Sequence, residues 1–249
     1  MIKKSISVII PCLNEEQNLQ ATYDNVVAAL RETAQEWEIL IFDDGSSDKT
    51  GEIADEIAKN DPAVVVTHNR PNKGFGYNFI RGIAIARMNY VSVMPGDNEI
   101  SLRSIKRIFA LVGRADMIIP FTVNMEVRPW SRRLISRLFT LTMNTIFRCE
   151  LQYYNGPTLH RADLVRELNI RTSGFAFQAV MLVKLIRRGY SFCEVDMYLQ
   201  QKQTYRSSAV RLRNILSVLG TILRLAVDVQ LDRSLRGFKQ VHRVDPHAD

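Results

Sequence analysis

Carboxylate side chains follow three separate apolar runs of the sequence, close to the point where each run ends. The residues concerned are Glu15, Asp43, Asp44, Asp97 and Glu99. If the apolar runs are strands of one parallel sheet, their carboxyl ends meet at one edge, which is where open α/β sheets bind ligands. Carboxylates gathered there repel one another unless a cation or a hydrogen-bonding ligand is present. The spacing therefore predicts a ligand site built on three strand ends.

A simpler interpretation gives the second of these loops a purely structural role. Residues 43–45 would form a turn, and Ser47 or Asp48 would cap the following helix. That interpretation accounts for Asp48 but leaves the carboxylates of the other two loops unexplained. Neither a P-loop nor the G-x-G-x-x-G dinucleotide motif follows the first apolar run, so the sequence excludes these two phosphate-binding loops.

The first 120 residues alternate between short apolar runs and amphipathic segments. The runs predict strands over residues 5–10, 37–42, 63–67, 90–94 and 117–120, and the segments predict helices over 15–31, 49–59, 76–87 and 101–112. Such alternation is typical of βαβ units around a mostly parallel sheet flanked by helices, which is the α/β fold class. After residue 120 the alternation ends, and longer helices are predicted over 129–148, 174–188 and 209–231, with a short strand over 191–195.

Three segments near the predicted strand ends resemble the family 2 inverting glycosyltransferases. Residues 11–16 read PCLNEE, residues 43–50 read DDGSSDKT and residues 72–78 read NKGFGYN. The resemblance is strongest over residues 5–120 and points to polyprenyl-phosphate sugar transferases of the dolichyl-phosphate mannosyltransferase type. It implies the GT-A fold, in which a mostly parallel, Rossmann-like sheet is flanked by helices.

The resemblance also implies that the first two loops bind the base and ribose of a nucleoside diphosphate sugar. The residues to which this binding role carries over are Pro11, Leu13, Glu15, Phe42, Asp43, Asp44 and Gly96. A carboxylate such as that of Asp43 can accept a hydrogen bond from the imide N–H of uracil or from the N–H groups of guanine. The expected donor is therefore a UDP-sugar or a GDP-sugar.

The metal motif of the family reads Asp-x-Asp-x-Gln or similar at the end of the fourth strand. Here residues 95–99 read PGDNE, so Pro95 replaces the first Asp, Asp97 matches the second, and Glu99 takes the last position. The resemblance implies that Asp97 and Glu99 bind Mg²⁺ or Mn²⁺ and that Asp97 is catalytic. Two carboxylates together with substrate phosphates are a usual ligand set for such ions. An inactive site is the alternative that Pro95 leaves open.

A basic stretch, KQTYRSS over residues 202–208, precedes the last predicted helix. In the family a stretch resembling R-x-x-G-x-S-K closes over the diphosphate and the acceptor phosphate. Lys202 matches its first Arg in charge, and Arg206 restores the positive charge that is lost where Ser208 replaces Lys. We expect Lys202 and Arg206 to be catalytic by assisting departure of the diphosphate. A solvated basic loop is the simpler interpretation.

Positive charge is concentrated in the second half of the chain, whose net charge as a whole is +7. Residues 201–243 carry nine Lys or Arg against two Asp, and residues 127–149 carry five Arg and no acid, so the remaining chain is acidic by about five charges. We expect a nucleotide-sugar-binding half over 1–124, an acceptor-binding half over 125–232 and a tail over 233–249. A polyanion is expected to meet the second half, unless that half is simply a solvated basic face.

The predicted helices over 129–148 and 209–231 place Arg residues among apolar ones, which is typical of helices that lie on an anionic membrane surface. No apolar run approaches the ~20 residues of a membrane span, and the N-terminal run is too short for a signal peptide. The expected location is cytoplasmic, peripheral on the cytoplasmic face of the membrane. Packing of these helices on the domain, or in a homodimer, is an equally open alternative for the last helix. Nucleic acid is not expected as a partner, because no aromatic side chains interleave with the basic ones as stacking platforms.

The family resemblance, together with these patterns, implies an inverting, metal-assisted glycosyltransferase that moves a sugar from a nucleoside diphosphate to a polyprenyl phosphate. A phosphate acceptor is ionised near neutral pH and needs positioning, whereas a hydroxyl acceptor needs a general base within hydrogen-bond reach. The second half of the chain is rich in Arg and shows no obvious base, which favours the phosphate. The alternatives are transfer onto a hydroxyl of a glycolipid or saccharide in cell-surface polysaccharide synthesis, and a non-catalytic nucleotide-sugar-binding protein.

Overall fold

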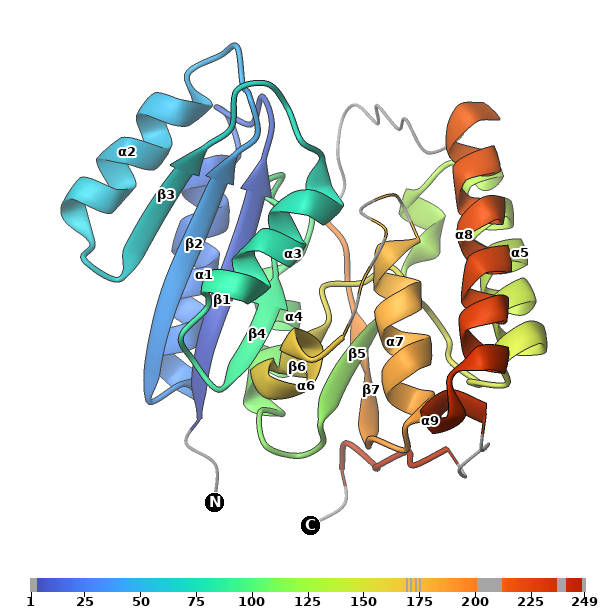
Figure 1. The fold of residues 1–249 in the computed structure, drawn as a ribbon. Helices are drawn as coiled ribbons and strands as arrows, with labels where there is room; N and C mark the ends of the chain where they lie inside the picture. The colour runs from blue at the N-terminus through green and yellow to red at the C-terminus, as the bar shows by residue number, and fades with distance from the viewer. Residues whose placement is uncertain are drawn as a thin grey trace.

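The computed structural model describes residues 4–168, 170, 172, 174, 176–200, 212–236 and 241–247, without side-chain placement for 212–215, 233 and 236. A seven-stranded sheet in the order β3-β2-β1-β4-β6-β5-β7 forms the centre of this part of the chain (Figure 1). The strands are β1 (Ser5–Cys12), β2 (Glu36–Asp43), β3 (Val64–His68), β4 (Tyr90–Val93), β5 (Met117–Thr122), β6 (Leu159–Arg161) and β7 (Phe192–Met197). The six strands predicted from apolar runs are all present.

Most neighbouring strands are parallel, as the alternation of strands and helices predicts. β1 pairs in parallel with β2 and β4, β2 with β3, and β5 with β7. β6 is the exception, because it lies antiparallel between β4 and β5 and joins the two halves of the sheet. Its three residues are too few to produce a recognisable apolar run, so the sequence pattern does not reveal this strand.

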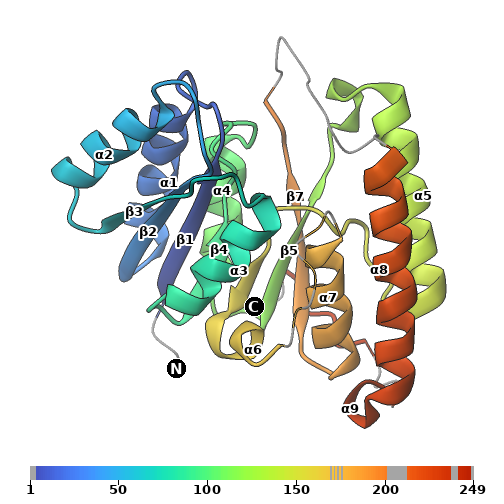
Figure 2. The same cartoon turned by 45° about the horizontal axis from the view of Figure 1, so that its top comes forward.

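Helices cover both faces of the sheet (Figures 1 and 2). One layer consists of α1 (Leu19–Thr33), α2 (Thr50–Asn60) and α4 (Leu102–Ala110), and the other of α3 (Phe75–Ile85), α6 (Ala162–Arg166) and α7 (Phe177–Arg187). Alternate side chains of β1 serve the two layers, since Ile6, Val8 and Ile10 belong to one core cluster and Ile9 to the other. This period of two is the expected geometry of a strand buried on both faces.

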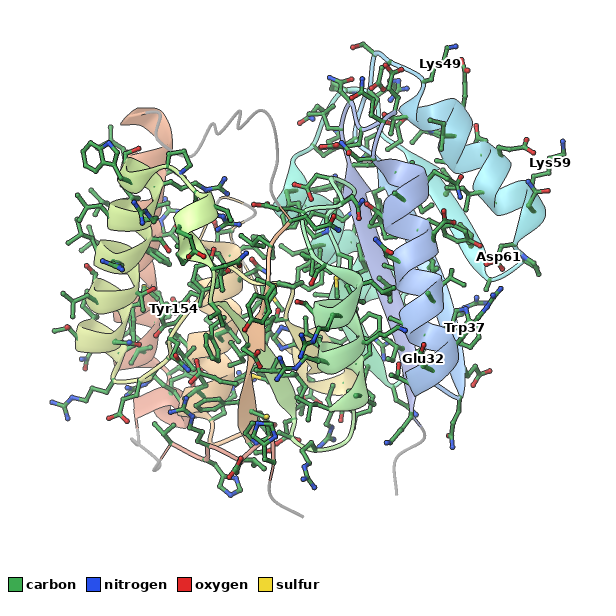
Figure 3. The ribbon with its side chains drawn as sticks, turned by 180° about the vertical axis from the view of Figure 1, so that it is seen from behind. Glu32, Trp37, Lys49, Lys59, Asp61 and Tyr154 are labelled. Atoms are coloured by element: carbon green, nitrogen blue, oxygen red, sulfur yellow. The ribbon has the colours of Figure 1, made fainter. Side chains whose placement is uncertain are left out.

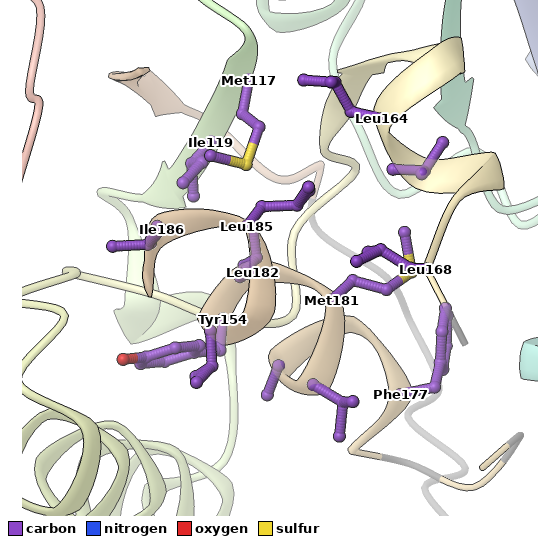
Figure 4. Close-up of a cluster of buried hydrophobic side chains, with 14 of the residues drawn as sticks. Met117, Ile119, Tyr154, Leu164, Leu168, Phe177, Met181, Leu182, Leu185 and Ile186 are labelled. Atoms are coloured by element: carbon purple, nitrogen blue, oxygen red, sulfur yellow. The ribbon is translucent and has the colours of Figure 1, made fainter. Parts of the chain in front are cut away.

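The core of the second half is built around α7, which is buried along nearly its whole length. Figure 4 shows Met181, Leu182, Leu185 and Ile186 of this helix packed among side chains from β5, α6 and the segment that carries Tyr154. A helix that is apolar on all sides needs neighbours on all sides. The sheet supplies one of them, and the outermost pair of helices supplies another.

That outermost pair consists of α5 (Trp130–Phe147) and α8 (Leu212–Leu231), which lie side by side in both views of the ribbon (Figures 1 and 2). The short helices η1 (Met125–Val127) and α9 (Arg233–Arg236) lie next to α5 and α8 in sequence. Tyr154 attaches α5 to the core: its hydroxyl donates to Asn144 Oδ1 at 2.7 Å, and its ring lies edge-on to Phe139 (Figure 3). No helix among the described residues is both long and apolar enough to cross a bilayer.

Candidate functional site

The three acidic loops predicted from the sequence meet at the carboxyl ends of β1, β2 and β4, which are adjacent in the sheet. Cys12 is in register with Asp43, and the backbone N–H of Asp44 donates to the Cys12 carbonyl at 2.9 Å. On the other side, the N–H of Gly96 donates to the Pro11 carbonyl at 3.0 Å. The sheet register therefore brings the three loops together along one edge.

The first and second loops are joined by hydrogen bonds between segments more than thirty residues apart. Asn14 N–H donates to Ser46 Oγ at 3.0 Å, Glu15 N–H donates to Thr50 Oγ1 at 2.7 Å, and Asn14 Oδ1 accepts from Ser47 N–H at 2.8 Å. Asn14 adopts a positive φ of 56°, which Asn tolerates better than most residues. Leu13 remains 45% exposed above these bonds. The backbone of the loop is thus fixed while an apolar side chain stays available to a ligand.

Asp43 is fully buried and ionised in a nest of donors. Its Oδ1 accepts from Ser46 N–H at 3.0 Å, and its Oδ2 accepts from His68 Nδ1 at 2.9 Å and from the Arg70 guanidinium at 3.2 Å. Burial opposes the charge, but the hydrogen bonds from His68, Ser46 and Arg70 together hold the pKa of Asp43 below its usual value. The carboxylate that the sequence assigned to the base therefore already organises Arg70 and His68, and contact with the base stays a prediction.

Asp44 fixes the loop between β3 and α3. Its Oδ1 accepts from Lys73 N–H at 2.8 Å and from Asn69 Nδ2 at 2.9 Å, and its Oδ2 accepts from Gly74 N–H at 2.8 Å. Gly74 begins α3 with a φ of 94°, a conformation that favours glycine. The negative charge at the start of a helix also suits the helix dipole. The carboxylate of Asp44 thus fixes the conformation of this loop through partners that lie 25 to 30 residues further along the chain.

Residues 95–99, here called the β4 loop, approach the first loop more closely than a side chain at position 96 would permit. A Cβ on Gly96 would lie 2.7 Å from the Cβ of Cys12, which accounts for glycine at this position. The Gly96 carbonyl accepts from Thr22 Oγ1 at 3.1 Å, and Asn98 Oδ1 accepts from Asn25 Nδ2 at 2.9 Å. Helix α1 therefore holds the loop that presents Asp97 and Glu99.

Glu99 is paired with a buried guanidinium that the sequence analysis did not identify. Arg128 is 8% exposed, and its Nε and Nη2 lie 3.3 and 3.1 Å from Glu99 Oε1. Its Nη1 donates to the Tyr153 hydroxyl at 3.0 Å. Nothing in the local pattern distinguishes Arg128 from the other Arg residues that precede or lie in α5. Only the fold, which brings residue 128 beside residue 99, reveals it.

Tyr153 also lines a cavity of about 340 Å³ between α5, the end of β5 and the segment before β6. Its polar lining includes Thr122, Ser136, Arg137, Thr140 and Gln152. The cavity and the β4 loop therefore share one hydrogen-bonded chain, from Tyr153 through Arg128 to Glu99. Lys202 and Arg206, the two predicted catalytic cations, fall outside the described residues.

Sequence comparison identifies the family of this fold and loop arrangement. Residues 7–174 match the sequence profile described as glycosyl transferase family 2. The chain belongs to glycosyl transferase family 2. This match covers the three acidic loops, Arg128 and the cavity-lining part of α5, so the resemblance inferred from the loop motifs is confirmed.

Two curated relatives extend beyond the profile. The chain is 29% identical over 209 residues to undecaprenyl-phosphate mannosyltransferase of Micrococcus luteus, covering 80% of this chain and 84% of the relative. It is 28% identical over 213 residues to polyprenol monophosphomannose synthase of Mycolicibacterium smegmatis, covering 79% and 77%. Glycosyltransferase activity follows from the family and from these relatives, in agreement with the prediction.

Solved structures confirm the GT-A architecture. Glucosyl-3-phosphoglycerate synthase from Mycobacterium tuberculosis in complex with UDP superposes with a TM-score of 0.68 at 18% identity, covering 90% of this chain and 80% of that chain. A complex of the same enzyme with Mn²⁺, UDP-glucose and phosphoglyceric acid gives a TM-score of 0.67 at 17% identity over 90% and 80% of the two chains. At this identity the likeness establishes the fold alone.

The β4 loop of this glycosyltransferase offers two hard oxygen ligands for a divalent cation. Asp97 Oδ1 accepts from Glu99 N–H at 3.1 Å, and both guanidinium bonds to Glu99 go to Oε1, so Arg128 does not occupy Oε2. The described residues contain no group of three or more His, Cys, Asp or Glu side chains that could hold a metal. A pair of carboxylates nevertheless fits an ion that takes its other ligands from phosphate and water.

Proposed function

We propose that this protein transfers a sugar, with inversion, from a nucleoside diphosphate to a polyprenyl phosphate at the cytoplasmic face of a membrane. The observation that carries the proposal is an exposed apolar surface on the two helices that flank the second half of the domain. The names of both curated relatives, which state a polyprenol or undecaprenyl-phosphate substrate, support it.

The α5–α8 surface consists of side chains that point away from the core and are between 48% and 72% exposed. Its members are Trp130, Leu134, Leu138, Leu141, Leu216, Leu219, Leu223, Val227 and Leu231. Contiguous exposed apolar patches mark protein or membrane interaction sites. The spacing places the members on one stripe of each helix. Such a stripe suits the boundary of a lipid bilayer.

Not every apolar side chain of α5 and α8 belongs to this surface. Phe139 packs on the core against Tyr154, and Ile222 is 7% exposed within the same core cluster. The apolar side chains of each helix are therefore divided between an edge that packs on the domain and an edge that stays exposed. Helix α5 also carries Arg132, Arg133 and Arg137, of which Arg133 and Arg137 lie next to the apolar stripe by helical spacing. A basic side chain near an anionic surface contributes about 1 kcal/mol.

The acceptor phosphate is proposed to bind in the cavity beside α5. Arg137 supplies a positive charge there, and Ser136 and Thr140 supply hydroxyl donors one helical turn apart. The polyprenyl chain would leave the cavity along the apolar edge of α5 without crossing water. Because the phosphate is already ionised, positioning by these groups replaces the proton transfer that a hydroxyl acceptor would require.

The donor is proposed to bind along the carboxyl edge of the sheet. Pro11, Leu13, Glu15 and Phe42 would hold the base and ribose together with Asp43 and Asp44, and Gly96 permits the close approach of the β4 loop. Asp97 and Glu99 would hold Mg²⁺ or Mn²⁺, which supplies neutralisation of the negative charge on the departing diphosphate. Lys202 and Arg206 are proposed to contact the same diphosphate.

A turnover assay with matched lipids tests the proposal. The full chain is incubated with UDP-sugars and GDP-sugars, Mn²⁺ and anionic vesicles that contain either undecaprenyl phosphate or undecaprenol. The proposal requires a lipid-linked sugar phosphate to form with undecaprenyl phosphate and nothing to form with undecaprenol. Transfer to undecaprenol alone would assign a hydroxyl acceptor, and binding of nucleotide without any transfer would assign a non-catalytic protein.

A further inference from the structure

Arg128 lies at the junction of three elements that the fold brings together. It immediately precedes Pro129, the N-cap residue of α5. Its side chain reaches both Glu99 in the β4 loop and Tyr153 beside the cavity. Its guanidinium and the carboxylate of Glu99 are only 8% and 13% exposed. One buried side chain therefore connects the start of α5 to the loop that carries Asp97.

A buried ion pair of this kind adds little to the free energy of unfolding. Desolvation of both charges offsets most of their attraction, so well-packed apolar side chains often stabilise a fold as well or better. The geometry instead suits orientation, because the planar guanidinium presents several N–H donors in a fixed fork. Here Nε and Nη2 hold one carboxylate oxygen while Nη1 holds a phenol.

The Glu99 side chain depends on this fork. Its backbone is anchored separately, since the Glu99 carbonyl accepts from Gln200 N–H at 2.7 Å and its N–H donates to Asp97 Oδ1. Within the described part of the chain, however, the hydrogen bonds to its carboxylate come from Arg128. Loss of the fork would release this side chain and leave the loop held by its backbone hydrogen bonds alone, so that the loop opens more often.

We infer that Arg128 is a positioning residue that holds the β4 loop in its working geometry through Glu99 and ties that loop to Tyr153 at the cavity. Arg128 contacts neither sugar donor nor acceptor in this account, and acts through the residues it orients. The inference rests on the proposed function for its kinetic consequences, but not for its effect on the loop itself.

The test compares three variants of the full chain with the wild type. Arg128→Lys keeps the charge but loses the fork, and Tyr153→Phe removes only the hydrogen bond to the phenol. Arg161→Lys is the matched control, because Arg161 pairs with Asp116 and Asp163 and lies in register with Tyr90, at the opposite end of β4. Three quantities are measured: the thermal unfolding midpoint, backbone hydrogen exchange of residues 96–100, and kcat with KM for the nucleotide sugar.

For Arg128→Lys we expect exchange of residues 96–100 to rise about tenfold with little change in the unfolding midpoint. We expect kcat to fall between about 10-fold and 100-fold, as for other small misplacements of reacting groups, while KM for the donor changes less than about threefold. Tyr153→Phe should show the same effects more weakly. Arg161→Lys should leave both loop exchange and kcat at wild-type values.

Wild-type loop exchange and wild-type kcat in folded Arg128→Lys would overturn the inference and reduce Arg128 to a structural ion pair. If that variant fails to fold, Tyr153→Phe decides in the same way. If the wild type transfers no sugar to undecaprenyl phosphate, the proposed function fails. The exchange measurement then still decides whether Arg128 positions the loop, so the two failures are distinguishable.

Discussion

The carboxyl edge of the sheet and the α5–α8 surface differ in whether their side chains have partners within the chain. At the edge, buried Asp43 and Asp44 accept hydrogen bonds from loops that follow two different strands. On the helices, leucines such as Leu141 and Leu223 are 64% and 69% exposed and point away from the core. One region is organised by hydrogen bonds within the chain, whereas the other leaves apolar area that the described residues do not cover.

From this difference we expect the carboxyl edge to be preorganised and the α5–α8 surface to meet an external partner. A site that must place a nucleotide and its leaving diphosphate benefits from a preorganised backbone, since no reorganisation is then needed during reaction. A surface that meets a bilayer needs only area and positive charge. Substitutions at the edge should therefore act on chemistry and nucleotide binding, and substitutions on the helices should act on membrane attachment.

Replacement of Asp97 is expected to give the largest effect. Asp97→Asn should reduce turnover by at least about 100-fold, because it removes a negatively charged ligand of the proposed metal ion, while the unfolding midpoint stays close to wild type. Initial rates at saturating Mn²⁺ measure this loss. Asp24→Asn, at an exposed position on α1, is the control and should leave the rates unchanged. Full Mn²⁺-dependent activity of Asp97→Asn would locate the site elsewhere.

Replacement of Asp43 should weaken nucleotide binding rather than abolish turnover. Asp43→Ala removes the proposed acceptor of the N–H groups of the base, and leaving these base donors unpaired should cost about 1–3 kcal/mol in affinity for UDP or GDP. Isothermal titration with each nucleotide measures it. Asp55→Ala removes only the outer partner of His68 and should cost less. Equal nucleotide affinity of wild type and Asp43→Ala would show that Asp43 does not contact the base.

Charged substitutions on the exposed side of α5 should weaken binding to a membrane. Leu138 and Leu141 are 54% and 64% exposed, so Leu138→Glu with Leu141→Glu should leave folding intact. Binding to anionic vesicles should fall by about tenfold or more, because each leucine contributes roughly 1.5–3 kcal/mol when removed from water. Val65→Glu, at an exposed position on β3, is the control. Sedimentation at low and high salt gives the binding. Unchanged binding of the double variant, or assembly of the wild type into a dimer through this surface, would contradict the membrane assignment.

The smallest expected effect is a pH dependence of stability at the carboxyl edge. Hydrogen bonds to Asp43 and Asp55 raise the pKa of His68 above its ordinary value despite partial burial. The stabilisation from protonated His68 is therefore complete below its unfolded pKa of about 6.5 and is lost as pH rises through the higher folded pKa. The free energy of unfolding of wild type and His68→Gln, measured by urea titration across that window, should converge as pH rises. A difference that does not vary with pH would show that the pKa of His68 is the same in the folded and unfolded states.

Local patterns predicted the parallel part of the sheet and the three acidic loops. Buried parallel strands are short apolar runs, and the loop motifs lie directly after them, so both features appear in contiguous sequence. β6 was not predicted because its three residues are too few to form an apolar run. The packing of Phe139 against the core could not be predicted, because a helix with many apolar side chains does not show which of them a neighbour covers.

Long-range partners could not be predicted in the same way. The sequence showed that Asp44 and Glu99 follow strand ends, but their partners come from residues 69–74 and from Arg128. Both pairings depend on the register of the sheet and on the path of the chain into α5. The metal role of Asp97 and Glu99 and the roles of Lys202 and Arg206 remain predictions.

The acceptor is proposed to be a polyprenyl phosphate that a membrane presents to the protein. The most direct test of this proposal is sugar transfer by the wild-type chain in anionic vesicles, with undecaprenyl phosphate and undecaprenol compared at equal concentration and the products resolved by mass spectrometry. We expect a glycosyl phosphate lipid to form from undecaprenyl phosphate, at a rate that falls when Leu138 and Leu141 are replaced by Glu. Transfer to undecaprenol, or equal rates for the wild type and the double variant, would contradict the proposal.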